Sequence, residues 1–222
     1  MKRIQLLALV LLLSITSLTQ AQEVQIDTDL LIRETQITDT DDDKMQIVWW
    51  IPVEFWKGVM ASDPSISEED AQAVIAAFEP YTLLAIVDGE MGAFGDIEYK
   101  PLKKLEKDLS FMINGEKMEI IPTDDQDFTL QMILSVMAPM LENMLGDMGK
   151  NMHFFVYNDV DEEGNRIADP SKAIQVEVQL DEDNYNFPTP LASCIASKTC
   201  PEDGATMNGN WSFCPFHGVE LK

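Results

Sequence analysis

Two matched pentapeptides near the C-terminus constrain this chain more than any other feature. They read Cys200-Pro201-Glu202-Asp203-Gly204 and Cys214-Pro215-Phe216-His217-Gly218. In each, a second potential metal ligand follows the cysteine by three residues, a spacing that lets one tight turn direct two donor atoms at a single ion. The glycine that comes next supplies backbone conformations that other residues adopt only with strain. The two stretches therefore predict a pair of turns that share one metal ion.

Roughly the last 25 residues, with these two turns, resemble a zinc ribbon, whose two knuckles read Cys-Pro-x-Cys-Gly. The resemblance implies a small β-hairpin module around one tetrahedral, structural zinc ion. It also implies four ligands, which in this chain are Cys200, Asp203, Cys214 and His217. Between the knuckles, Asn208-Gly209 suits a hairpin turn, and Trp211 and Phe213 are then expected to cover the metal.

The chain departs from the ribbon pattern at both second ligands. His217 stands where cysteine is commonest, a change that zinc accepts, and Asp203 is a less common ligand in a structural site. Cys194, six residues before Cys200, is therefore kept as the alternative fourth ligand. Two of the three cysteines can instead form a disulfide, which would leave one thiol over, and a ribbon that has lost its metal is a further alternative.

Residues 1–21 have the three parts of a secretory signal. Lys2 and Arg3 give a positive start, residues 6–15 are continuously apolar, and Ala21 is a small residue at the expected cleavage point. Ten apolar residues are too few to cross a bilayer, which needs about 20. No other stretch is judged apolar enough to span one. We therefore expect cleavage, export to the periplasm or the medium, and no membrane insertion after cleavage.

Residues 22–187 have the pattern of an α+β domain with a mixed or antiparallel sheet and two main helices. The first helix begins after Ser67, carries three acidic residues in its first turn and ends before Pro80. The second covers residues 128–148 and contains Pro139. Because apolar residues nearly encircle it, we expect it to be buried or to pack on a partner.

Strands are predicted where β-branched, aromatic or alternating residues cluster. These segments are 24–38, 45–55, 81–87, 109–113, 117–121, 152–158 and 173–180. Asn114-Gly115 predicts a type I′ hairpin turn, and Pro52 predicts an edge position or a bulge. Residues 184–190 contain Pro188 and Pro190 and read as a linker, so the chain divides into a signal (1–21), an α+β domain (22–187) and a linker with the tail (188–222).

The net charge and the absence of common catalytic motifs argue against several classes of function. With 15 basic and 39 acidic residues the net charge is -24, so we expect no nucleic-acid partner, because phosphate contacts need clustered Lys and Arg. The chain has no Gly-rich phosphate loop, nucleophile elbow or His-Glu-x-x-His. We therefore favour a non-catalytic exported protein whose structural zinc fixes a small module for contact with a protein partner.

Two other function classes stay open. A metal-handling protein would bind and pass on zinc or copper with the Cys/His tail and a methionine-rich helix, since thioethers suit Cu(I). The methionines concerned are Met132, Met137, Met140, Met144 and Met148, of which the last four share one helix face by spacing. The third class is an enzyme whose site the sequence does not reveal.

Overall fold

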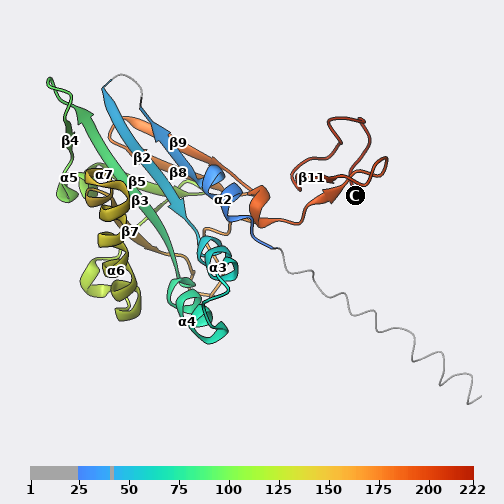
Figure 1. Cartoon of the computed structure of the whole chain (residues 1–222), viewed down its shortest axis with the longest axis horizontal. Coiled ribbons are helices and arrows are strands. Elements are labelled where there is room, and N and C mark those ends of the chain that lie inside the picture. Colours follow the sequence, from blue (N-terminus) through green and yellow to red (C-terminus); the bar gives the residue numbers. More distant parts are fainter. Residues whose placement is uncertain (1–24, 41–42) are drawn as a thin grey trace, which may run out of the picture.

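The computed structural model describes residues 25–40 and 43–222, so the predicted signal lies outside the described residues. The chain is an α+β protein with antiparallel sheets, which confirms the predicted fold class. Two sheets pack face to face, and helices cover the second face of the larger sheet, which gives three layers (Figure 1).

The larger sheet is built around the long strand β3. Its strands are β1 (Gln36–Asp39), β2 (Lys44–Ile51), β3 (Tyr81–Met91), β4 (Ile97–Tyr99) and β7 (His153–Asn158). They run in the order β1-β2-β3, and β7 and β4 pair with the first and last parts of β3. Side chains alternate along β2, so Val48 and Trp50 face the second sheet while Ile47 and Ile51 face the helices.

The second sheet has the order β6 (Glu116–Met118), β5 (Leu109–Ile113), β8 (Gln175–Leu180) and β9 (Asp183–Pro188). Asn114 and Gly115 join β5 to β6 with φ of 52° and 80°, which confirms the predicted hairpin. The linker predicted at 184–190 is wrong, because β9 pairs with β8 along its length. The alternation of Asn with Tyr185 and Phe187 drives this pairing, since both rings are buried between the sheets.

The helices are α2 (Thr28–Thr35), α3 (Val53–Ser62), α4 (Glu68–Phe78), α5 (Leu102–Asp108), α6 (Phe128–Leu145) and α7 (Asp147–Lys150), with 3-10 turns η1 (Thr123–Asp125) and η2 (Ala192–Cys194). The Ser67 hydroxyl caps α4 by accepting the Asp70 N–H at 3.1 Å, as predicted. The strands predicted at 24–38 and 45–55 are wrong in part. Asp27 caps α2 within the first, and Pro52 precedes α3 instead of lying in a strand.

Helix α6 differs most from expectation. Leu130 is its one fully buried residue, whereas Phe128, Val136 and Met144 are 77%, 59% and 74% exposed. By length and composition α6 is also long and apolar enough to cross a membrane, so the judgement that no such stretch follows the signal was wrong. Its inner side packs on the larger sheet, and its outer side faces water.

Residues 195–222, here called the tail module, stand away from the two sheets (Figure 1). The module contains β10 (Lys198–Thr199) and β11 (Thr206–Met207), which pair antiparallel. We call residues 25–194 the body. The Glu34 carboxylate on α2 holds the chain just before the module, accepting the N–H groups of Ala192 and Ser193 at 2.9 and 3.0 Å.

Candidate metal centre

The two pentapeptides fold as two copies of one turn. In each, the cysteine N–H donates to the carbonyl five residues later, at 2.9 Å for Cys200 and 2.8 Å for Cys214. The N–H groups of Gly204 and Gly218 donate back to the cysteine carbonyls, both at 2.8 Å. These glycines have φ of 74° and 67°, a region that L side chains rarely adopt. The glycine after each second ligand is therefore what lets the turn close.

A small framework holds the two turns together. Thr199 pairs with β11 on one side and exchanges backbone hydrogen bonds with Lys222 on the other, at 2.8 and 3.2 Å. Met207 and Leu221 pack against Cys200 and Cys214 as the core of the module. The first turn thus lies inside the β10–β11 hairpin, and the hairpin predicted around Asn208-Gly209 was misplaced, because β11 pairs backwards along the chain.

The aromatic cover predicted over the metal is also wrong. Trp211 and Phe213 are 43% and 61% exposed. Met207 and Leu221 are the apolar side chains buried beside the cysteines. The two rings therefore lie on the surface of the module.

Three of the four predicted ligands converge on one point. The Nδ1 atom of His217 lies 3.3 Å from Cys200 Sγ and 3.6 Å from Cys214 Sγ. Ligand atoms of the three residues all lie within 4.8 Å of one another. With Zn–S near 2.3 Å and Zn–N near 2.0 Å, a tetrahedral ion places neighbouring donors roughly 3.5 Å apart. The three residues are therefore placed so that they could hold a metal ion.

The fourth predicted ligand, Asp203, lies at the edge of this group. Its Oδ2 atom is 3.9 Å from His217 Nδ1, and its Oδ1 atom accepts the Ala205 N–H at 3.0 Å. Both Asp203 and His217 are exposed, whereas the two cysteines are buried. The group thus has a buried sulfur side and an open side toward water.

The backbone around each sulfur favours a thiolate. Cys200 Sγ accepts the N–H groups of Glu202 and Asp203, and Cys214 Sγ accepts those of His217 and Phe216. Burial works against ionisation of Cys214, yet these hydrogen bonds and the neighbouring Cys200 lower its pKa. Burial raises the pKa of Cys200.

Cys194 is not part of this group. It lies in the core between the two sheets, where Ser193 Oγ is 3.7 Å from its sulfur. Burial raises the pKa of its thiol to about 12. The alternative fourth ligand was therefore wrong, because the body holds Cys194 before the chain reaches the module. All three cysteines are free thiols.

The methionines predicted to share one face of the second helix meet two environments. Met137 and Met148 pack on the core between the helices and the larger sheet. Met140 and Met144 are 57% and 74% exposed.

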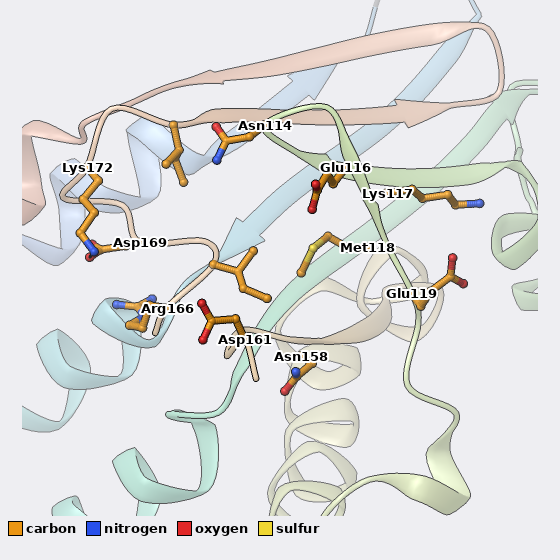
Figure 2. A pocket seen from close by; sticks show the side chains of 12 residues that line it. Asn114, Glu116, Lys117, Met118, Glu119, Asn158, Asp161, Arg166, Asp169 and Lys172 are labelled. Carbon is orange, nitrogen blue, oxygen red and sulfur yellow. Dashed lines mark ion pairs between the residues drawn. The ribbon is translucent and has the colours of Figure 1, made fainter. Parts of the chain in front are cut away.

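A separate cavity of about 570 Å³ lies between the β5–β6 hairpin and the loop that follows β7 (Figure 2). Arg166 on its wall donates to Asp159 at 2.9 and 3.0 Å and to Glu54 at 2.6 Å. Burial raises the pKa of Asp159 even though Arg166 opposes the shift. Lys172, also on the wall, pairs with Asp169 at 3.1 Å.

The sequence analysis missed this charge network. The available signal was one arginine in a loop with five acidic residues between 159 and 169. Since both of these cations already contact protein carboxylates, the cavity is a weaker candidate site than the cysteine–histidine group.

No protein family model, curated protein or solved structure matches this chain. The chemistry of its own residues is therefore the basis for assigning a function. The strongest such feature among the described residues is the Cys200, Cys214 and His217 group.

Proposed function

We propose that the chain is an exported, non-catalytic protein whose tail module is held by one structural zinc ion and contacts a protein partner. The observation that carries this proposal is the convergence of two cysteine sulfurs and one imidazole nitrogen at 3.3 and 3.6 Å. The repeated turn around each cysteine supports it, because a backbone that donates to both sulfurs stabilises the charge that metal ligation requires.

The donor types favour zinc among the common metals. Two thiolates and an imidazole suit a tetrahedral zinc ion, whereas magnesium and calcium prefer oxygen donors. Asp203 is the proposed fourth ligand, since its carboxylate already lies beside His217. With Asp203 in place, all four ligands would be protein groups, which is typical of structural and not catalytic zinc.

The size of the module explains why it would need a metal. Its buried core consists of Cys200, Met207, Cys214 and Leu221, and its two strands have two residues each. Segments below about 40 residues usually need a metal, a disulfide or a partner to fold. Structural zinc in zinc-finger peptides contributes about 10–16 kcal/mol of apparent binding free energy at pH 7. Zinc would thus supply most of the stability of the tail module.

The proposed partner contact rests on three exposed rings of the module. Trp211, Phe213 and Phe216 are 43%, 61% and 77% exposed. Aromatic side chains are enriched in the cores of protein interfaces. Zinc would hold these rings in a fixed arrangement without itself touching the partner.

The test is to express the full chain in an exporting host and to measure its zinc and thiol content. We expect a mature N-terminus at Gln22, one zinc per chain, and two thiols that react with a disulfide reagent only after chelation. The Cys200→Ser, Cys214→Ser and His217→Ala variants should lose the zinc. Cys194→Ser is the matched control and should keep it, because Cys194 lies in the body.

Three outcomes would contradict the proposal. Protein without zinc and with a single free thiol would mean a disulfide between two cysteines. An uncleaved N-terminus in the cytoplasm would contradict export. A Cu(I) equivalent that disappears in a Met140→Leu/Met144→Leu variant would favour metal handling instead.

A further inference from the structure

Helix α6 presents a row of large apolar side chains to water. Phe128, Met132, Val136, Met140 and Met144 follow one another at intervals of four residues and are between 50% and 77% exposed. We call these five residues the α6 ridge. Side chains four residues apart form a continuous ridge on a helix, the feature that packs into the groove of a second helix.

The fold of the body does not need these side chains to be apolar. The opposite side of α6 anchors it, with Leu130 fully buried and Ile133, Leu134 and Leu141 packed on the core behind the larger sheet. Asp127 caps the first turn by accepting the Thr129 N–H at 2.7 Å. Because water surrounds the ridge, its apolar character gains nothing for the isolated chain.

Acidic residues predominate near the ridge. The chain from 122 to 150 and the neighbouring helix α4 with Glu79 contain nine acids and one basic residue, Lys150 at the end of α7. The acids are all exposed: Glu68, Glu69, Asp70, Glu79, Asp124, Asp125, Asp127, Glu142 and Asp147. Such a rim attracts a cationic partner and repels an anionic one.

We propose that the α6 ridge docks an amphipathic helix of another protein, apolar on one face and rich in Lys and Arg beside it. A helix that docks in this way presents apolar anchors at i, i+3, i+4 and i+7 to the surface it meets. Methionine side chains adapt their shape to the helix they meet. A second copy of this chain fits poorly, because it would bring the same acidic rim and a second charge of -24 against the first. Anionic lipid is disfavoured for the same reason.

The docking site is independent of the proposed zinc module, since no ridge residue lies in the tail module. Zinc content therefore reports on the proposed function, and peptide binding reports on the ridge. The failure of one leaves the other measurable in the same protein sample.

The test measures binding of a fluorescein-labelled peptide to the purified full chain at physiological salt. The probe is a leucine–lysine helix as long as α6, with leucine at i, i+3, i+4 and i+7, and its control is a scrambled peptide of the same composition. The ridge variant is Val136→Glu/Met140→Glu. The matched control is Met91→Glu/Phe94→Glu, which adds the same charge at residues of the body that are 55% and 99% exposed and off the ridge.

We expect the amphipathic peptide to bind about 10- to 100-fold more tightly than the scrambled one, as burial of two apolar anchors predicts. The ridge variant should lose this difference, and the off-ridge variant should keep it. Equal binding of both peptides by all variants would overturn the proposal, since charge alone would then explain it. A dimer that the ridge variant disrupts and the off-ridge variant does not would overturn the proposal in favour of a second copy of this chain. Binding of the chain to vesicles of zwitterionic phosphatidylcholine would overturn it in favour of a lipid surface.

Discussion

The body and the tail module hold their folds by different means. The body buries two large apolar clusters, one between the sheets and one under the helices. The module buries four side chains, of which two are cysteines. Long strand pairings join distant parts of the body, whereas the turns of the module are local. The difference teaches that apolar burial suffices for the body, whereas the module buries so few side chains that we propose a metal ion to hold it.

The largest expected effect belongs to the core of the body. Phe111 is fully buried and packs against the Tyr157 ring with centroids 4.9 Å apart. Phe111→Ala should lower the free energy of unfolding of the body by about 3–5 kcal/mol in urea, because it leaves a cavity between the sheets. Zinc content under native conditions should stay at one per chain. Loss of zinc from the folded variant would show that the two regions are coupled.

The junction between the regions should give a smaller effect. Glu34 accepts two backbone N–H groups and the Ser193 hydroxyl, the last at 2.6 Å. Glu34→Gln should cost the body about 1–3 kcal/mol in the same urea titration, because hydrogen bonds to a charged acceptor are lost. Zinc affinity should not change. A matching fall in zinc affinity would mean that the junction also positions the ligands.

A matched pair of glycines, one in each region, lets the same substitution be compared in the module and in the body. Gly218 in the second turn and Gly95 in the body have φ of 67° and 83°, and a Cβ would have no neighbour within 4 Å at either. Alanine should therefore cost about 1–2 kcal/mol at each from backbone strain alone. For Gly218→Ala we expect roughly tenfold weaker zinc binding in a competition titration. Gly95→Ala should leave zinc binding unchanged and affect only the unfolding of the body.

The smallest effect is a pH dependence that belongs to the body. Burial lowers the pKa of His153 in the folded chain, although Glu106 opposes the shift. As pH falls below about 6.5, the ordinary histidine pKa, the unfolded chain therefore takes up a proton that the folded chain does not. Stability should decline from there toward the folded-state pKa. His153→Gln should flatten this decline in urea titrations between pH 5 and 8, roughly the range in which histidine titrates, since every other titratable group is common to both proteins.

Local signals in the sequence predicted local structure well. The Ser67 cap and the Asn114-Gly115 turn are each specified by a few adjacent residues, and both appear where expected. The spacing of three residues placed Cys214 and His217 in one turn for the same reason. Each of these features needs only the chain within a few residues of itself, whereas the approach of Cys200 to His217 also needs the two turns to pack together.

Features that depend on distant contacts were harder to predict. The alternating pattern at 184–187 is a strand only because β8 lies beside it, and the two prolines concealed it. Cys194 is close to the module in sequence, yet it is held in the core of the body. An apolar helix such as α6 looks the same in sequence whether its outer face is buried or left for a partner.

The most direct test of the central claim is the amide NMR spectrum of the full mature chain before and after zinc chelation. We predict that chelation collapses the resolved signals of residues 198–222, including those of Gly204 and Gly218, and leaves the dispersed signals of the body in place. One equivalent of zinc should restore them. A tail module whose spectrum stays dispersed without metal would contradict the claim that zinc holds it.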